Sequence, residues 1–290
     1  MSGRTVDAVD AWANGFLGVI IFSGSLPATR VAVADFSPLF LTSTRAVLAT
    51  LLAIALLGVM RQPLPKRSDF PSLAIVSLGV VVGFPLLTAL ALQHITSAHS
   101  IVFIGLLPLA TAIFGVLRGG ERPKPLFWLF SILGSATVAG FALTNDAEIS
   151  LIGDLLMVAA VIVCGLGYAE GAVLSRRYGG WQVISWALVI ALPFMLAISI
   201  ATIPTSWTGI ASSAWIGLAY VSVFSMFVGF VFWYRGLALG GSTGVGQLQL
   251  LQPFFGLALA GLLLGEAVAW SMLAATGVVV VCVAFARKFA

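Results

Sequence analysis

Charged side chains are scarce in this sequence: 8% of the 290 residues are Asp, Glu, Lys or Arg, whereas 60% are hydrophobic. A soluble domain of ordinary composition carries about 25% charged residues. A chain with so few charges cannot cover a water-exposed surface with polar groups. Its mean hydropathy of +1.12 is typical of a protein that lies in a lipid bilayer. The scarcity of charge therefore leaves no room for a soluble catalytic domain.

Residues that bind metals or act as nucleophiles are equally scarce. The sequence has two cysteines and two histidines, and both Cys164 and Cys282 fall within apolar runs. Cysteine in such a position is typical of a small buried hydrophobic residue rather than of a disulfide or a metal ligand. The sequence has no phosphate-binding loop, zinc-ligand spacing or nucleophile elbow. We therefore expect no cofactor, no metal site and no enzyme activity.

Long apolar runs fill most of the chain and predict its fold class. A helix of roughly 20 apolar residues crosses the hydrocarbon core of a bilayer. Runs separated by charged, Pro, Gly or Ser residues predict ten such helices, near residues 12–33, 38–60, 70–92, 97–117, 125–143, 151–174, 181–201, 213–235, 244–264 and 267–286. The residue alternation of a membrane β-barrel is absent. The predicted fold is thus an all-α integral membrane protein, in which each helix satisfies its own backbone groups.

The basic residues predict how these helices are oriented. If the N-terminus is cytoplasmic, twelve of the 14 Lys and Arg residues fall in cytoplasmic segments and none in external loops. This is the bias that membrane proteins show, and a wrong number of helices would scatter these residues over both sides. We therefore expect ten transmembrane helices with both termini cytoplasmic. The net charge of +4 then reflects orientation, and we expect no nucleic-acid partner.

The two remaining basic residues, Arg30 and Arg45, lie in the outer half of the first two predicted helices. A charge at such depth is costly and is often functional. A long side chain can also reach the membrane interface, and Asp35 is close to Arg30 in the sequence. Structural pairing and direct contact with a substrate are both open interpretations of these arginines.

The second half of the sequence repeats landmarks of the first half at an offset of 145 residues. The matched pairs are Ser97 and Ser242, Pro108 and Pro253, and Gly120-Glu121 and Gly265-Glu266. Because five helices per half is an odd number, the halves 1–145 and 146–290 are expected to insert with opposite orientations. Inverted repeats of this kind are typical of secondary transporters, which bind substrate near the midplane between the repeats and expose it to each side in turn.

Pro108 and Pro253 fall near the middle of the predicted fourth and ninth helices. Each proline removes a helical hydrogen bond and leaves a carbonyl group free one turn earlier. Such a position provides a free backbone carbonyl for binding and a hinge in the same helix. The alternative is that proline is tolerated in membrane helices generally. The matched depth of the two prolines favours the hinge interpretation.

Several of these features together resemble the EamA-type drug/metabolite transporter superfamily. They are the run from Ser37-Pro38 to Arg45, the prolines of the fourth and ninth helices, the Gly-Glu pairs that close those helices, and the stretch from Tyr234-Arg235-Gly236 through Gln252-Pro253 to Gly277. The resemblance covers essentially the whole chain, because each half resembles the family separately. Two departures occur: Phe22-Ser23-Gly24-Ser25 stands where a Trp-Gly often opens the first motif, and the second half lacks counterparts of Pro38 and Arg45.

Within that superfamily the sequence most resembles the bacterial aromatic amino-acid exporters. The resemblance implies a secondary transporter in the cell inner membrane that exports aromatic or neutral amino acids, or related small metabolites, by alternating access. A broad-specificity drug or metabolite efflux carrier is the alternative. The implied partners are a small-molecule substrate and membrane lipid. An ion channel is disfavoured because acidic rings and a filter-like run are absent.

Polar side chains within apolar helices predict where a substrate binds, because each costs free energy unless it finds a partner. Gln249 and Gln252 are three residues apart on one helix face. Their amides both donate and accept, which suits a zwitterionic amino acid, and hydrogen bonding between helices is an equally good explanation. The other candidates for a mixed polar and aromatic pocket are Ser23, Ser25, Pro27, His99, Phe103, Tyr168 and Tyr234. His99 either lines an outward mouth or caps its helix near water.

Glu170 is the one acidic residue clearly within a predicted helix, and it is the candidate for proton coupling. A structural pair with Arg176 or Arg177 is the alternative interpretation. Because the sequence offers no acidic relay, we expect facilitated export that is driven by the substrate gradient.

Overall fold

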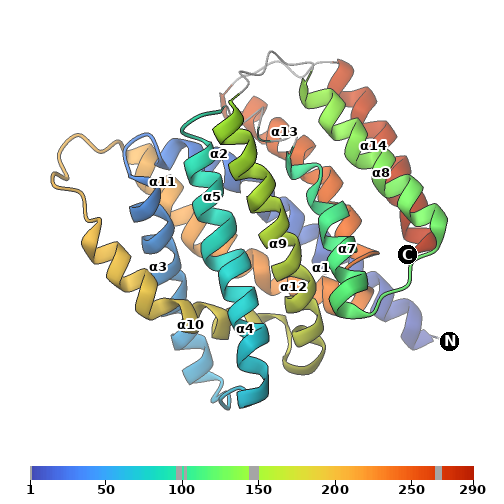
Figure 1. Cartoon of the computed structure of the whole chain (residues 1–290), viewed down its shortest axis with the longest axis horizontal. Helices are drawn as coiled ribbons and strands as arrows, with labels where there is room; N and C mark the ends of the chain where they lie inside the picture. The colour runs from blue at the N-terminus through green and yellow to red at the C-terminus, as the bar shows by residue number, and fades with distance from the viewer. Residues whose placement is uncertain (1, 96–99, 101–102, 144–149, 265–269) are drawn as a thin grey trace.

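The computed structural model describes residues 2–95, 100, 103–143, 150–264 and 270–290, and this part of the chain is helical throughout its regular structure (Figure 1). In chain order the α-helices are α1 (Ser2–Ser23), α2 (Ser25–Ala32), α3 (Pro38–Val59), α4 (Phe70–Val76), α5 (Phe84–Ala91), α7 (Leu107–Gly119), α8 (Pro125–Leu143), α9 (Leu151–Tyr178), α10 (Gly180–Ala201), α11 (Ser212–Tyr220), α12 (Gly229–Gly240), α13 (Gln252–Leu264) and α14 (Trp270–Phe289). The 3-10 segments are η1 (Arg67–Asp69) and η4 (Val245–Leu251), and the π-helical segments are η2 (Ser77–Gly83) and η3 (Val221–Val228).

The described helices have the length and composition of membrane spans. Six stretches are long and apolar enough to cross a bilayer: Val9–Ala32, Pro38–Val59, Arg67–Ala91, Leu151–Tyr178, Gly180–Ala201 and Ser212–Gly240. Leu107–Gly119 and Pro125–Gly140 are shorter apolar helices. The all-α membrane fold is therefore confirmed, and every predicted segment contains helix. The number of ten spans and the orientation of the termini stay predictions.

The middle of α3 buries small residues and exposes large apolar ones. In α3, Ala46, Ala49 and Ala53 are fully buried, whereas Leu48 and Leu51 are exposed. Lipid tails are as apolar as leucine, so burying large apolar side chains gains little between membrane helices. Small residues instead allow the helix backbones to approach closely. The exposed leucines are consistent with contact between this helix and lipid.

Several long helical stretches are interrupted, and two of the interruptions are π-helical. The first residues of η2 and η3 are 144 positions apart, so they occupy similar places in the two halves. After η2, the N–H of Phe84 bonds to the carbonyl of Gly79, five residues earlier. Pro85 follows and lacks the N–H that would bond to the carbonyl of Val81. Such π-helical turns are rare and are frequent at functional sites.

Pro108 and Pro253 start helices rather than interrupt them, which corrects their predicted place in the middle of long helices. Pro108 is the second residue of α7 and follows a turn at residues 105–106. Pro253 is the second residue of α13, and α13 follows the 3-10 segment η4 directly. Proline fits the first turn of a helix because the N–H that it lacks has no partner there. The hinge role of these prolines stays a prediction.

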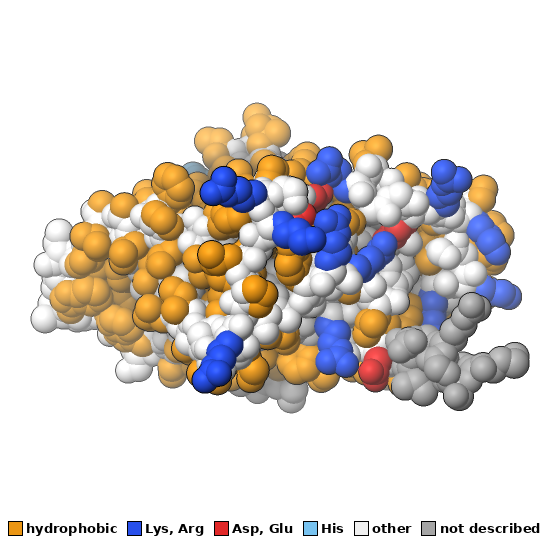
Figure 2. All heavy atoms as spheres, turned by 90° about the horizontal axis from the view of Figure 1, so that it is seen from below, with side chains coloured by type: hydrophobic (Ala, Val, Ile, Leu, Met, Phe, Trp, Pro, Cys, Tyr) orange, Lys and Arg blue, Asp and Glu red, His pale blue; other side chains and the backbone are white. Residues whose placement is uncertain are grey.

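Exposed basic residues gather at one end of the bundle, which we call the basic end (Figure 2). Contacts between distant segments bring the chain together there. Arg177 binds the carboxylate of Asp69 at 3.1 Å, and the N–H of Lys124 donates to the carbonyl of Phe289 at 2.8 Å. This one-sided arrangement is the one that the sequence predicts for a cytoplasmic face.

Close packing between η2 and α9 provides a test of this arrangement. A Cβ atom added to Gly79 would lie 2.6 Å from the backbone carbonyl oxygen of Val163. A backbone atom in a packed helix cannot move aside cheaply. We therefore expect Gly79→Ala to lower the free energy of unfolding by about 1–3 kcal/mol, the usual cost of overpacking. Thermal unfolding of the purified protein in detergent measures this change.

Gly58→Ala is the matched control, because nothing lies within 4 Å of a Cβ atom at Gly58. This variant should unfold at the same temperature as the unmodified protein or slightly above it. If the two variants proved equally stable, the described contact between η2 and α9 would be wrong.

Candidate functional site

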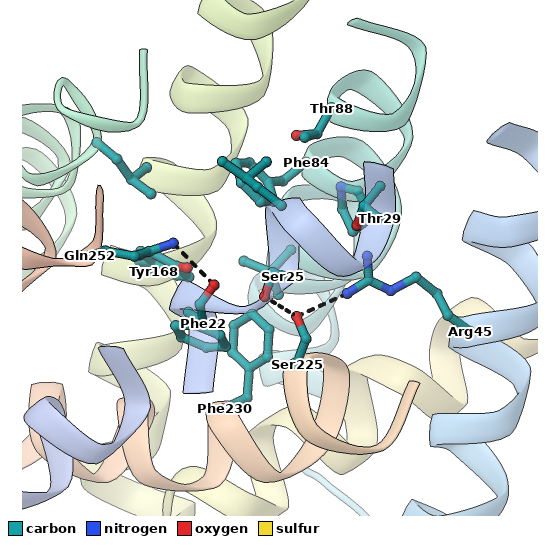
Figure 3. A pocket seen from close by; sticks show the side chains of 14 residues that line it. Phe22, Ser25, Thr29, Arg45, Phe84, Thr88, Tyr168, Ser225, Phe230 and Gln252 are labelled. Atoms are coloured by element: carbon teal, nitrogen blue, oxygen red, sulfur yellow. Dashed lines mark hydrogen bonds between the residues drawn. The ribbon is translucent and has the colours of Figure 1, made fainter. Parts of the chain in front are cut away.

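A cavity lies between helices from both halves of the chain (Figure 3). It has about 530 Å³ of empty space, including the part that is open to the outside. Its lining is mostly apolar and aromatic with a few polar groups, as in typical small-molecule sites. The lining residues are Phe22, Ser25, Leu26, Thr29, Arg45, Val80, Phe84, Pro85, Thr88, Leu107, Tyr168, Ser225, Phe230 and Gln252.

The break between α1 and α2 forms one wall of this cavity. Pro27 lacks an N–H and leaves a carbonyl group of the preceding turn without its helical partner. The hydroxyl of Tyr220 donates to the carbonyl of Ile21 at 2.6 Å, which satisfies another backbone group beside the break. The ring fits only because residue 24 is glycine: a Cβ at Gly24 would lie 2.4 Å from the Tyr220 oxygen. Ser25 follows directly and faces the cavity.

Three polar side chains form a chain of hydrogen bonds across the cavity wall (Figure 3). Arg45 in α3 donates from Nη2 to Oγ of Ser225 in η3 at 3.1 Å. The Oγ atoms of Ser225 and Ser25 are 2.7 Å apart. The chain therefore joins α2 and α3 of the first half to the π-helical segment of the second half. Both π-helical segments line the cavity, η3 through Ser225 and η2 through Val80.

Aromatic rings and an amide form the other side of the cavity. The ring centroids of Phe22 and Phe230 are 5.0 Å apart, and those of Tyr168 and Phe230 are 6.0 Å apart. Gln252 donates from Nε2 to the carbonyl of Phe22 at 3.4 Å. Its Oε1 has no hydrogen-bond partner among the described residues. The amide thus supports the end of α1 and also offers an unused acceptor.

The structure brings three of the predicted substrate residues together: Ser25, Tyr168 and Gln252 line the cavity. The other described candidates lie outside this lining. They are Ser23, Pro27, Phe103, Tyr234 and Gln249. His99 lies outside the described residues.

Three of the candidates outside the lining, Ser23, Tyr234 and Gln249, are buried. Ser23 donates to the carbonyl of Val19 at 2.7 Å, and Tyr234 donates to the carbonyl of Gly167 at 3.1 Å. Gln249 is fully buried, and Phe103 is half-buried and packs against the hydrophobic core. Tyr234 and Ser23 therefore satisfy backbone carbonyl groups rather than face the cavity.

Sequence patterns did not indicate several residues of the cavity wall. Thr29, Thr88 and Ser225 are ordinary hydroxyl residues in apolar helices, and the sequence contains many of these. Arg45 was singled out by its depth, and the structure places its side chain at the cavity. The depth of a charged residue within an apolar run is therefore a signal for a cavity residue. The helix face of a polar residue cannot be predicted from its spacing where π-helical turns change the number of residues per turn.

Glu170 has a partner that the sequence did not suggest. Its Oε2 binds Nε of Arg118 in α7 at 2.8 Å. The predicted alternative partners are wrong, because Arg176 binds Glu121 and Arg177 binds Asp69. Glu170 is buried and is not among the described lining residues.

Arg30 also differs from the sequence expectation. Its Nη1 donates to the carbonyl of Leu92 near the end of α5. Asp35, the suggested neighbour, instead accepts from the N–H of Ala211 at 2.9 Å. Arg30 therefore stabilises the packing of α2 near α5.

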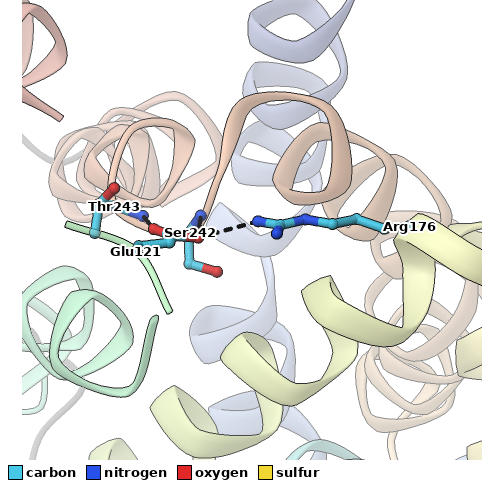
Figure 4. Close-up of polar contacts among 4 residues, drawn as sticks. All are labelled: Glu121, Arg176, Ser242 and Thr243. Carbon is cyan, nitrogen blue, oxygen red and sulfur yellow. Dashed lines mark hydrogen bonds and ion pairs between the residues drawn. The ribbon is translucent and has the colours of Figure 1, made fainter. Parts of the chain in front are cut away.

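A second polar cluster, the Glu121 tie, joins the halves at the basic end (Figure 4). The helix α7 ends at Gly119 and is capped by Gly120, whose φ of 66° is left-handed and suits glycine. The next residue, Glu121, accepts the backbone N–H groups of Ser242 and Thr243, both at 2.7 Å. Arg176 in α9 donates to the same carboxylate at 3.3 Å. One first-half carboxylate thus holds two second-half segments together.

The sequence model of the EamA-like transporter family matches residues 11–143 and 151–287. The chain belongs to the EamA-like transporter family. An uncharacterized transporter, YdeK, of Bacillus subtilis (strain 168) is 64% identical over 97% of this chain and 98% of its own. These matches make the protein a multi-pass transporter of a bacterial membrane.

More distant EamA-like relatives carry more specific names. A probable terminal-alkyne amino-acid exporter of Streptantibioticus cattleyicolor is 27% identical over 82% of this chain and 80% of its own. An S-adenosylmethionine/S-adenosylhomocysteine transporter of Chlamydia trachomatis serovar L2 is 25% identical over 91% of this chain and 85% of its own. A solved crystal structure that is 18% identical superposes with a TM-score of 0.78 over 97% of this chain and 99% of that one, which shows a shared fold.

The Glu121 tie of this EamA-like protein is testable by access to the cavity. Glu121→Ala leaves two backbone N–H groups and Arg176 without their shared acceptor, so the basic end should open more often. Cys164 and Cys282 are buried, so a cysteine introduced at Thr88 of the cavity can serve as the reporter. We expect a membrane-impermeant thiol reagent, applied from the basic end, to label it several-fold faster in the Glu121→Ala variant.

Asp10→Ala is the matched control at the same end. Asp10 and Arg235 form an exposed ion pair at 3.7 Å, and such pairs contribute about 0–1 kcal/mol. This control should label at the unmodified rate. If Glu121→Ala also labelled at that rate, the tie would not close the basic end.

Proposed function

We propose that the protein exports aromatic or other neutral amino acids, or related small metabolites, across the bacterial inner membrane by alternating access. The observation that carries this proposal is the cavity between the two halves, where Ser25, Tyr168 and Gln252 converge with several aromatic rings. Hydroxyl and amide groups hold polar parts of a small molecule, and the rings hold its apolar part. The relative named as an amino-acid exporter supports the same class of substrate.

Alternating access is supported by the arrangement of the halves 1–145 and 146–290. We propose that they are inverted repeats that rock about the cavity. Matching interruptions favour such movement: η2 and η3 occupy similar positions, and Pro108 and Pro253 both begin a helix after a break. The two prolines are the proposed hinges. In this scheme the Glu121 tie breaks when the basic end, the proposed cytoplasmic end, opens.

Broad drug or metabolite efflux is the second candidate, and the apolar part of the lining favours it. Phe22, Phe84 and Phe230 offer aromatic surface without a fixed set of polar partners. Competition between labelled phenylalanine and unrelated apolar drugs in proteoliposomes separates the two candidates. An amino-acid exporter should be inhibited by neutral amino acids and not by such drugs.

The role of Gln252 can be tested in reconstituted vesicles. Gln252→Ala removes an amide whose Oε1 is free for a ligand, and one hydrogen bond contributes about 0.5–1.5 kcal/mol. We therefore expect transport of labelled phenylalanine to fall by roughly tenfold, with nearly unchanged yield of folded protein. Equal losses of yield and transport would show that Gln252 acts only in holding helices together.

Gln247→Ala provides the matched control. Gln247 is fully buried and donates from Nε2 to Oγ of Ser131 at 3.2 Å, so it joins η4 to α8 away from the described cavity lining. Its loss should lower stability and yield while the surviving protein transports phenylalanine at the usual rate per molecule.

Coupling is the last element of the proposal. We propose facilitated transport, because the carboxylate of Glu170 binds Arg118 and does not line the described cavity. Glu170→Gln keeps a side chain that accepts a hydrogen bond from Arg118. Transport down a substrate gradient should therefore persist in this variant at equal pH on both sides. A requirement for an imposed pH gradient, lost together with transport in Glu170→Gln, would identify proton coupling instead.

A further inference from the structure

Arg45 is a charged side chain buried in the apolar part of the bundle. It is 6% exposed and lines the cavity. Within the described residues the ion pairs involve other arginines, and Arg45 has no acidic partner. A buried cation without a counter-charge is costly in a low-dielectric environment. A ligand that supplies the missing negative charge would remove this cost.

The guanidinium group also has unused hydrogen-bond donors. Its Nη2 donates to Oγ of Ser225, whereas the buried Nε has no partner among the described residues. Arginine presents five N–H donors in a planar fork that matches the two oxygens of a carboxylate. The guanidinium group of Arg45 therefore has a free N–H donor at Nε and a shape that is suited to bind a carboxylate.

The described surroundings of Arg45 favour an anion over a cation. The described lining contains no Asp or Glu, and its polar groups near Arg45 are hydroxyls such as Ser25 and Thr29. Gln252 lies on the far side of Ser25 and Ser225 from Arg45 (Figure 3). The α-ammonium of an amino acid is adjacent to its carboxylate, so it would lie beside the Arg45 cation with no acidic side chain to receive it.

We propose that Arg45 binds the carboxylate of a small organic anion, whose apolar or aromatic body packs on the phenylalanines of the cavity. An α-amino group is not required for this binding. A monocarboxylate without the amino group then binds at least as tightly as the corresponding amino acid. The proposal deepens the proposed function and rests on it for the transport step, whereas binding can be measured separately.

The experiment compares three compounds that share a phenyl ring: 3-phenylpropionate, phenylalanine and phenylalanine amide. Binding to the purified full-length protein in detergent is measured by thermal stabilisation over a range of concentrations. We expect the Kd of 3-phenylpropionate to equal or fall below that of phenylalanine. The amide, which has no carboxylate, should bind at least tenfold more weakly than either.

Variants assign this preference to Arg45. Arg45→Gln should weaken the binding of both carboxylates at least tenfold and should not weaken that of the amide, whose ammonium no longer meets a like charge. Arg45→Lys keeps the charge without the planar fork and should give an intermediate loss. Arg30→Gln is the matched control, because Arg30 donates to the carbonyl of Leu92 and is not in the described lining. It should preserve the order of the three compounds.

Three results would overturn the proposal. They are equal binding of the amide and the carboxylates to the unmodified protein, carboxylate binding that survives in both Arg45 variants, and stabilisation by chloride alone that equals that by 3-phenylpropionate. The first comparison needs no variant, so it decides the matter even if Arg45→Gln does not fold. The last result would identify a site for an inorganic counter-ion.

Transport assays separate this proposal from the proposed function. If vesicles carry phenylalanine but the compounds show no preference that depends on Arg45, the anion site is wrong and the exporter function stands. If carboxylates bind through Arg45 but neither they nor amino acids are carried, the site stands and the transport proposal is wrong.

Discussion

Hydrocarbon around the helices forces each backbone N–H and C=O group to find a partner within the protein. A continuous helix meets this requirement by itself, and every interruption creates groups that something else must satisfy. At the break between α1 and α2, Tyr220 donates to the carbonyl of Ile21, and Gln252 donates to that of Phe22. Both partners come from the second half of the chain. This interruption of the first half is therefore held by side chains of the second half.

The same requirement places the cavity where the interruptions meet. Ser25 follows the break before α2, Ser225 lies in the π-helical segment η3, and Gln252 begins α13 after the 3-10 segment η4. Each of these side chains projects from a point at which the regular helical pattern fails. Local departures from the α-helix thus bring polar groups into an apolar bundle. Movement at these points would change the cavity and the contacts between the halves together.

The sequence predicted the parts of this structure that depend on local composition. Apolar runs predicted helices, and the depth of Arg45 marked it as unusual. The contacts that define the site depend on long-range packing and had no local signal: Glu170 meets Arg118, 52 residues away, rather than the nearby Arg176 or Arg177. Tyr234, a candidate for the pocket wall, donates to a backbone carbonyl of α9, a contact that one-dimensional spacing does not indicate.

Two charged residues between the halves have opposite environments, and the contrast bears on how the protein works. The carboxylate of Glu121 accepts hydrogen bonds from two backbone N–H groups and an arginine, so its charge is satisfied within the protein. Arg45 has one hydroxyl as acceptor and no acidic partner among the described residues. The basic end is therefore held together by contacts within the protein, whereas the cavity contains a cation without an acidic partner among the described residues. A carboxylate that entered the cavity would supply this acidic partner. It would also weaken the hydrogen bond between Arg45 and Ser225, which joins the two halves.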